Sequence, residues 1–265
     1  MPLPDFLIAG VPKAGTTALH AALVPHPALY LSKVKEPKFF LSDGPPPATG
    51  GPGDVQTYQE HVWRRADYEA LFDPAPPGTV RGEATPFYLY DLAAHDRIKR
   101  LVPDAKLIVL LRDPVERAYS HWKERRTEGV EPLGFPEALA AEASRTAGER
   151  ERLTADPAYV STAYDWYSYR ERGVYLDHLT PWLDRFDRSQ LLVMASETLY
   201  RDPAASYAKV LDFIGLPPFE LPSYDVFNDR PSKGMDDGVR AQLTDFYRPH
   251  NAALAQRLGM SFDWA

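Results

Sequence analysis

A segment near the N-terminus combines small residues, a lysine and two hydroxyls in a pattern that suits phosphate. Residues 10–17 read GVPKAGTT, between the apolar run FLIA at 6–9 and an Ala/Leu-rich stretch at 16–23. These patterns predict a strand, a tight turn and a helix. Exposed N–H groups and the dipole at a helix start attract anions, and small residues let phosphate oxygens approach the backbone. The segment therefore predicts an anion-binding loop formed by Lys13, Ala14, Gly15, Thr16 and Thr17.

This loop differs from the common nucleotide-binding loop. Its glycines have the spacing of GxxxxGK[ST], but the lysine lies three places earlier, at Lys13, and Thr16 occupies the usual lysine position. The pattern indicates a phosphate loop of another subtype. An ordinary strand–helix turn with a solvated lysine is the open alternative.

A second group of polar residues follows another buried run. The run at 107–111, LIVLL, is typical of a strand in a parallel sheet, and it leads into Arg112, Asp113 and Pro114. Pro114 starts a predicted helix that carries Ser120. A cation and a hydroxyl would thus lie at the sheet edge where ligands bind in open parallel sheets. Alternatively, Arg112 pairs with Asp113 or Glu116, and Ser120 is solvated.

The rest of the chain alternates apolar runs with helical patterns. We predict strands at 6–9, 107–111 and 191–194, and helices at 16–23, 92–101, 114–126, 136–152 (exposed), 174–186, 203–214 and 236–258 (broken near Pro249). Residues 33–40 are too irregular to assign. The alternation predicts an α/β fold with a central parallel sheet flanked by helices, in a single domain over 1–265 with an exposed loop at about 42–56.

Composition restricts the function further. The 265 residues are 44% hydrophobic and 25% charged, which suits a folded domain with a large core. The absence of cysteine excludes disulfides and a thiol nucleophile. A net charge of −7 argues against a nonspecific nucleic-acid binder. No apolar stretch predicts a membrane span or a signal peptide, so we expect a cytoplasmic protein. The oligomeric state cannot be predicted.

Six separated segments together carry a family resemblance. They are FLIAGVPKAGTTAL at 6–19, KEPKFF at 35–40, EATPFYL at 83–89, AKLIVLLRDPVERAYSHW at 105–122, SKG at 232–234 and FYRPHN at 246–251. In this order they resemble the cytosolic and Golgi sulfotransferases, above all the heparan sulfate O- and N-sulfotransferase domains and their bacterial relatives. The resemblance extends over about 6–264 and implies the P-loop-like sulfotransferase fold.

The resemblance implies an activity. Such enzymes transfer a sulfuryl group from 3'-phosphoadenosine 5'-phosphosulfate (PAPS) to a hydroxyl or, less commonly, an amine, without a metal, and release 3'-phosphoadenosine 5'-phosphate (PAP). Residues 13–17 would hold the 5'-phosphosulfate, Arg112 and Ser120 the 3'-phosphate, and Lys233 with Gly234 would close over the nucleotide. We expect the acceptor to be a small glycosylated metabolite or an oligosaccharide.

The same resemblance assigns the chemical step. Glu36 of the KEPKFF segment would be the base, and Lys13 would stabilise the leaving phosphate. Flanking lysines would keep the Glu36 carboxylate ionised, although without the family it would be taken for a surface carboxylate. The resemblance also points to Lys38, Thr85 and Pro86 as acceptor-binding residues.

Several positions depart from the family pattern. Glycosaminoglycan enzymes usually carry a lysine where this chain has Ala84, which disfavours a heavily sulfated polymer as acceptor. Their cysteine-bridged hairpin is missing, Met235 stands where an arginine is common, and Lys38 stands where histidine is common. These changes predict fewer contacts to the 3'-phosphate and a different way of holding the acceptor.

Two other functions stay open at this point. Asp113 after a buried strand resembles a magnesium-binding aspartate, as in an Mg-ATP-dependent phosphoryl-transfer enzyme, although Lys13 is out of register and Arg112 lies beside the aspartate. A nucleotide-binding regulator would be marked by loss of Glu36 or Lys13, and both are present. The seven histidines lack metal-ligand spacing, and His121 is either structural or turned toward the cofactor. The aromatic cluster at 164–169 is either core or an acceptor platform.

Overall fold

The computed structural model describes residues 2–45, 61–156, 159–224 and 234–264. Most of the loop expected at 42–56 therefore lies outside the described residues. The chain divides into two compact units. The described residues of the first unit are 2–45, 61–111 and 181–224, and those of the second are 112–156, 159–180 and 234–264. Each unit is described by itself, and the single domain stays a prediction.

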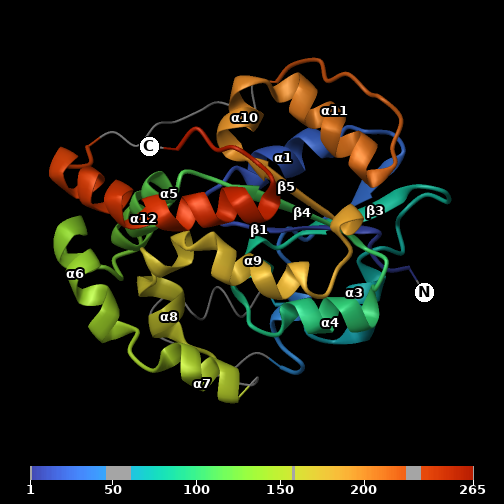
Figure 1. The fold of residues 1–265 in the computed structure, drawn as a ribbon. Coiled ribbons are helices and arrows are strands. Elements are labelled where there is room, and N and C mark those ends of the chain that lie inside the picture. Colours follow the sequence, from blue (N-terminus) through green and yellow to red (C-terminus); the bar gives the residue numbers. More distant parts are fainter. Residues whose placement is uncertain (1, 46–60, 157–158, 225–233, 265) are drawn as a thin grey trace. The chain divides into compact units, whose positions relative to one another are not determined.

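The first unit is built on a five-stranded parallel sheet in the order β2-β3-β1-β4-β5 (Figure 1). The strands are β1 (Phe6–Gly10), β2 (Leu29–Leu31), β3 (Val80–Ala84), β4 (Lys106–Leu111) and β5 (Leu191–Ala195). Phe6 of the central β1 lies opposite Gly82 and Lys106. Gly82 has no room for a side chain, because a Cβ there would lie 2.2 Å from the Phe6 ring. The predicted α/β fold with a central parallel sheet is confirmed.

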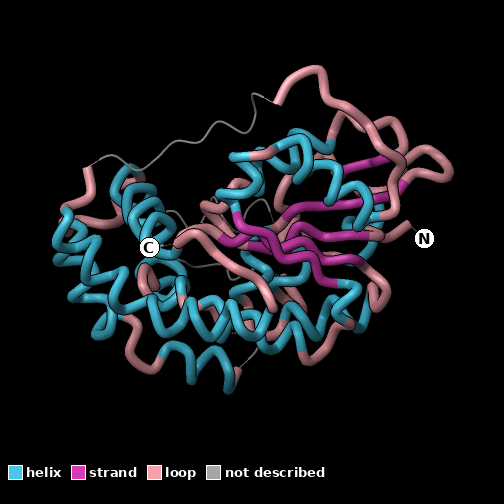
Figure 2. Tube along the Cα trace, turned by 45° about the horizontal axis from the view of Figure 1, so that its top comes forward, coloured by secondary structure: helices cyan, strands magenta, loops and turns pink. Residues whose placement is uncertain are grey.

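Helices pack against both faces of this sheet. They are α1 (Thr16–Leu23), α3 (Arg65–Ala70), α4 (Ala94–Leu101), α10 (Ser196–Arg201) and α11 (Pro203–Ile214), with short 3₁₀ helices at Phe39–Leu41, Pro86–Tyr90 and Arg188–Gln190. Figure 1 shows α1, α10 and α11 on one side and α3 and α4 on the other, and Figure 2 shows the strands side by side between them. The apolar runs of β1, β4 and β5 are buried because helices cover both faces.

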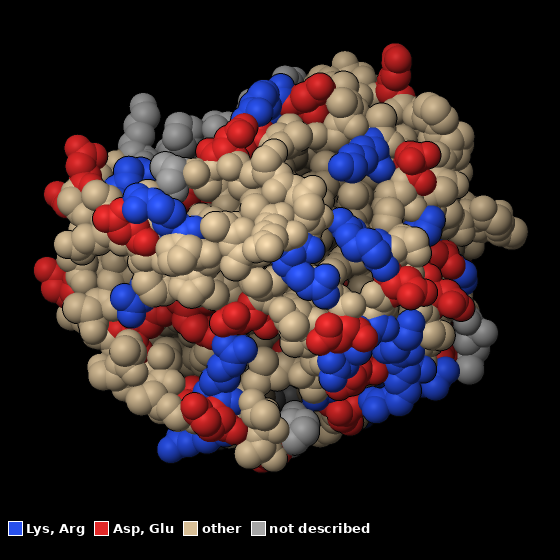
Figure 3. All heavy atoms as spheres, in the orientation of Figure 1, with Lys and Arg blue, Asp and Glu red and all other residues tan. Residues whose placement is uncertain are grey.

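Some charged side chains of the first unit form ion pairs between elements. Arg100 of α4 bonds Asp43 at 3.1 Å, and Arg185 pairs with Asp96 of the same helix. Figure 3 shows basic and acidic side chains interspersed in this region. Such mixing fits the modest net charge of −7 and gives this region no large surface of one sign.

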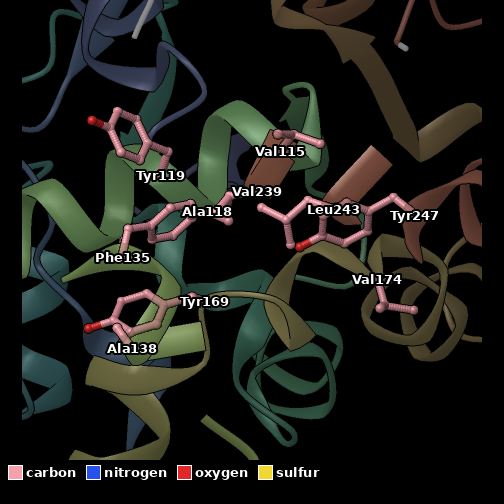
Figure 4. Close-up of a cluster of buried hydrophobic side chains, with 10 residues drawn as sticks. All are labelled: Val115, Ala118, Tyr119, Phe135, Ala138, Tyr169, Val174, Val239, Leu243 and Tyr247. Carbon is pink, nitrogen blue, oxygen red and sulfur yellow. The ribbon is translucent and has the colours of Figure 1, made fainter. Parts of the chain in front are cut away.

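The described part of the second unit is helical. Its helices are α5 (Pro114–Thr127), α6 (Phe135–Arg145), α7 (Glu149–Ala155), α8 (Thr162–Tyr167), the 3₁₀ turn Glu171–Gly173, the start of α9 (Tyr175–Leu183) and α12 (Asp237–Leu258). The ten buried side chains drawn in Figure 4 come mainly from α5, α6 and α12 and form the core of this unit. The amphipathic helices fold here because they bury these apolar faces against one another.

Four predictions about elements are corrected by the structure. Residues 136–152 form two helices, because Gly148 adopts a left-handed conformation with φ of 75° between α6 and α7. This region is also not simply exposed, since Ala138 and Glu142 of α6 are buried. The helix α12 continues through Pro249, because packing of Leu243 and Tyr247 into the core offsets the lost hydrogen bond. Strands β2 and β3 were not predicted, since β2 has three residues and β3 contains Arg81, Gly82 and Glu83.

Within the described part of the chain, no helix has the length and apolar character needed to cross a membrane. The cytoplasmic location stays a prediction.

Candidate active site

The predicted anion-binding loop joins β1 to α1 as expected. Gly15 is the N-cap of α1 with φ of 89°, and no described side chain caps the first turn. A Cβ at Gly15 would lie 2.5 Å from the Tyr200 hydroxyl. Ser196 donates a hydrogen bond of 2.6 Å to the Ala14 carbonyl. The loop is thus supported from behind by α10, and the first-turn N–H groups of α1 can bind an anion.

Backbone strain in the described residues is concentrated at three predicted site residues. Lys13, Glu36 and Lys38 have φ of 72°, 61° and 60°, and they are the non-glycine residues with positive φ in this part of the chain. A left-handed conformation costs a residue with a side chain about 1–2 kcal/mol. Such residues cluster at active sites, where the surrounding structure holds them in place. The strain therefore singles out the same residues as the motifs.

Glu36 lies in residues 32–38, which we call the Glu36 segment. This segment connects β2 to the 3₁₀ helix at Phe39–Leu41 and lies alongside the C-terminal end of β3. The Ser32 N–H donates to the Gly82 carbonyl at 3.0 Å, and the Glu36 N–H donates to the Ala84 carbonyl at 3.0 Å. The Glu36 carboxylate accepts a bond of 2.7 Å from Lys35 and is about a quarter exposed. It can therefore accept a proton from a molecule that approaches from solvent.

His20 connects the anion-binding loop with the Glu36 segment. It lies one helical turn after Thr16 on α1. Burial lowers the pKa of His20, and the Lys35 charge lowers this pKa further while Glu36 opposes it. These charges act on the imidazole because the Glu36 segment passes close to α1. The first unit thus contains both the loop and the predicted base, and their joining in one site stays a prediction.

Glu83 is a buried carboxylate beside the Glu36 segment that sequence reasoning did not single out. It lies in β3, is 1% exposed and accepts hydrogen bonds from three hydroxyls. Burial raises the pKa of Glu83 to about 7, against the effect of these bonds. The sequence signal was a carboxylate two residues before Thr85-Pro86. This signal was missed because the charged residues of β3 do not predict a strand.

The predicted acceptor-binding residues lie around the Glu36 segment. Thr85 and Pro86 are buried, and the Thr85 hydroxyl bonds Glu83 and the Lys38 N–H. Lys38 is 6% exposed. Burial lowers the pKa of His61 to about 4, with the Lys38 charge as the second cause. Contact of these residues with an acceptor stays a prediction.

In the second unit, the predicted phosphate-binding residues gather around α5. Arg112 lies 3.8 Å from Glu116, which bonds Arg240 at 2.7 Å, so one carboxylate faces two guanidinium groups. Ser120 is partly buried on the same helix. Gly234, with φ of 98°, lies against α5, where a Cβ would be 3.4 Å from the Tyr119 hydroxyl. The guanidinium groups of Arg112 and Arg240 are of the kind that binds phosphate. Lys233 lies outside the described residues.

His121 and the aromatic cluster at 164–169, for which the sequence left two roles open, take structural positions. His121 is buried and packs edge-on against Tyr169, with ring centres 5.0 Å apart. Tyr164, Trp166 and Tyr169 are buried, and the Tyr169 hydroxyl donates to Glu131 at 2.8 Å. The cluster at 164–169 is mainly core, as its simpler reading predicted.

Comparisons with known proteins identify the family of this chain. A family profile described as "Sulfotransferase domain" matches residues 90–226. The chain is 30% identical to human heparan sulfate glucosamine 3-O-sulfotransferase 6, covering 98% of this chain and 73% of that protein. It is also 30% identical to mouse heparan sulfate glucosamine 3-O-sulfotransferase 3B1, covering 99% of this chain and 65% of that protein's length. The chain thus spans about two thirds of that relative.

A solved structure gives the same result. The sulfotransferase from Alicyclobacillus acidocaldarius superposes with a TM-score of 0.82 at 32% identity, covering 99% of this chain and 98% of that one. A sulfotransferase domain from the curacin biosynthetic pathway shares the fold, with a TM-score of 0.56 at 14% identity. This chain belongs to the sulfotransferase family, and the resemblance inferred from its motifs is confirmed.

Proposed function

We propose that the protein transfers a sulfuryl group from PAPS to a hydroxyl of an oligosaccharide or a small glycosylated metabolite. The observation that carries this proposal is the coincidence of backbone strain with Lys13, Glu36 and Lys38, which lie in the sequence segments that resemble the sulfotransferases. Strain at a lysine of the anion-binding loop and at a carboxylate supports a transfer site that the surrounding structure holds in place.

The residues of the anion-binding loop fit the 5'-phosphosulfate of PAPS. A side chain at position 15 would meet Tyr200, so only glycine fits there and α10 packs directly against the loop. Ser196 holds the Ala14 carbonyl, which keeps the loop in one conformation. The N–H groups at the start of α1 and the Lys13 ammonium supply positive charge. Arg112, Ser120 and Lys233-Gly234 would hold the 3'-phosphate.

The proposed chemical step uses two residues of the first unit. The acceptor hydroxyl oxygen forms a bond to sulfur, and the bond from sulfur to the bridging oxygen breaks. The electron pair of the broken bond stays on the 5'-phosphate of PAP, where Lys13 stabilises the charge. The hydroxyl proton passes to the Glu36 carboxylate. Transfer of this kind depends mainly on positioning and charge stabilisation, by analogy with phosphoryl transfer.

The acceptor class rests on the relatives and on one departure from them. The relatives are named as sulfotransferases of heparan sulfate glucosamine, which supports a sugar hydroxyl. Ala84, where glycosaminoglycan enzymes usually carry lysine, is a buried residue of β3 and supplies no charge. We therefore expect an acceptor with fewer sulfate groups than heparan sulfate.

Calorimetric titration of the protein with PAP, and separately with ATP, tests the donor, each with and without magnesium. Binding of PAP near micromolar without metal, with little binding of ATP, is expected. A preference for magnesium-ATP would replace the proposal with phosphoryl transfer. Transfer of label from PAPS to desulfated and to fully sulfated heparan chains then tests the acceptor, and we expect the desulfated chain to react faster.

A further inference from the structure

Glu83 lies behind the Glu36 segment and bonds the groups that hold it. Its Oε2 accepts a hydrogen bond of 2.9 Å from the Thr85 hydroxyl, and its Oε1 accepts bonds of 2.7 Å and 3.2 Å from Tyr88 and Tyr68. Because it is 1% exposed, solvent cannot replace these partners. An ionised carboxylate is purely an acceptor, so it forces all three hydroxyl protons to point toward itself.

The oxygens of two of these hydroxyls face the N–H groups that fix the Glu36 segment and the turn after it. The Lys38 N–H donates to the Thr85 Oγ1 at 3.3 Å, and the Phe40 N–H donates to the Tyr88 hydroxyl at 3.5 Å. A hydroxyl that donates to Glu83 keeps its lone pairs for these N–H groups. The main chain adds the bond from the Glu36 N–H to the Ala84 carbonyl, directly after Glu83 in β3.

These bonds hold a conformation that the backbone would not adopt alone. Glu36 and Lys38 are both left-handed, with φ of 61° and 60°. Each left-handed residue costs conformational free energy, which the surrounding bonds must offset. Loss of the Thr85 or Tyr88 acceptor would leave a buried N–H group unsatisfied and let the segment relax.

We propose that Glu83 is a positioning residue, which orients the hydroxyls of Thr85 and Tyr88 so that they hold Glu36 in its reactive place. The inference rests on the proposed function, because Glu36 is the base only in a transfer enzyme. Glu83 does not reach solvent and touches neither donor nor acceptor. It acts through the backbone of the Glu36 segment. Burial raises the pKa of Glu83 to about 7, so the carboxylate form is present mainly above neutral pH.

The first test follows the backbone and needs no substrate. Hydrogen exchange of the Glu36, Lys38 and Phe40 amides is measured by NMR in the wild type, Thr85→Val and Thr85→Ser. Thr85→Val removes both the bond to Glu83 and the acceptor for the Lys38 N–H, so exchange of the Lys38 amide should accelerate at least tenfold. Thr85→Ser keeps the hydroxyl and should stay close to wild type. Equal protection in all three proteins would overturn the inference.

The second test follows turnover, with PAPS and desulfated heparan as the probe. Glu83→Gln places an amide donor among the hydroxyls, and we expect kcat to fall at least tenfold while the Kd of PAP changes less than twofold. In a Glu36→Gln background, Glu83→Gln should lower kcat little further, because its effect on kcat passes through Glu36. Glu69→Gln is the matched control, since Glu69 is a buried carboxylate of the same unit that pairs with Arg65.

The outcomes separate the inference from the proposed function. Unchanged kcat in Glu83→Gln, or losses that add fully in the double variant, would overturn the positioning role while transfer itself stands. A wild type that neither binds PAP nor transfers sulfuryl would overturn the proposed function. In that case the hydrogen-exchange result still decides whether the hydroxyls that bond Glu83 hold the Glu36 segment.

Discussion

At the scale of single residues, the proposed mechanism assigns Lys13 to the donor and Glu36 to the acceptor. Both are strained, at φ of 72° and 61°, but only Lys13 lies in the anion-binding loop. A cation there contributes to donor binding and to the transition state, whereas a base contributes only once the acceptor loses its proton. The two residues should therefore separate cleanly in kinetics.

Lys13→Ala and Glu36→Gln test this division. Lys13→Ala should abolish transfer and weaken PAP binding, because the phosphate loses its neutralising charge. Glu36→Gln should leave PAP binding intact and lower kcat about 10²-fold or more. The Kd comes from calorimetry and kcat from label transfer. Lys33→Ala, which removes another lysine of the Glu36 segment, is the control. Equal loss of PAP affinity in both variants would remove Glu36 from the role of base.

At the scale of elements, the anion-binding loop depends on how α10 packs behind it. Gly15 and Gly78 both have left-handed φ, at 89° and 80°, but only at Gly15 would a Cβ meet a neighbour, the Tyr200 hydroxyl at 2.5 Å. Gly78→Ala therefore measures the cost of φ alone, about 1–2 kcal/mol. Gly15→Ala should lower the free energy of unfolding by more than this amount, as measured by urea unfolding. It should also weaken PAP binding, as measured by calorimetry. Tyr200→Phe in the Gly15→Ala background should recover part of the lost stability and PAP affinity. If Gly15→Ala and Gly78→Ala behaved identically, α10 would have no steric role.

At the scale of the whole molecule, buried histidines should make the fold sensitive to acid. Burial lowers the pKa of His178 to about 3 and that of His61 to about 4, from an ordinary value of 6.5. Between these values the unfolded chain binds more protons than the folded one, so stability falls as pH falls below about 6.5. Each histidine contributes up to about 2 kcal/mol between pH 7 and 5. The groups around them are Arg150, Arg172, Asp177 and Glu171 for His178, and Lys38 and Arg97 for His61.

Glu83 changes the stability of the fold with pH in the direction opposite to that of the buried histidines. Its pKa rises from 4.5 to about 7 on folding, among Tyr68, Tyr88 and Glu36, so the folded chain binds more protons in this window and stability falls as pH rises through it. Urea unfolding of the wild type from pH 5 to 7 should show a net rise in stability. The rise should become steeper in Glu83→Gln and shallower in His178→Gln. The same slope in all three proteins would contradict these assignments.

The motifs and the tertiary structure determined different parts of this site. The local pattern of apolar runs, Pro114 and Gly215 predicted the elements β1, α1, β4, α5 and α11, because strand and helix periods and caps are properties of neighbouring residues. The candidate residues Lys13, Glu36 and Arg112 were found the same way, from motifs that the family resemblance made interpretable. Strand β3 was missed, because its pairing with β1 and β2 outweighs the low strand propensity of its glycine and charged residues.

Only the tertiary structure brought the Glu36 segment beside β3 and α1. The bonds from Glu36 to Ala84 and from Lys38 to Thr85 join residues almost fifty positions apart, and no local pattern encodes them. The role of Glu83 and the left-handed backbone at Glu36 and Lys38 depend on those bonds. The sequence by itself therefore predicted which residues would carry the chemistry. Their conformation was decided by parallel strand pairing, which places distant segments at one sheet edge.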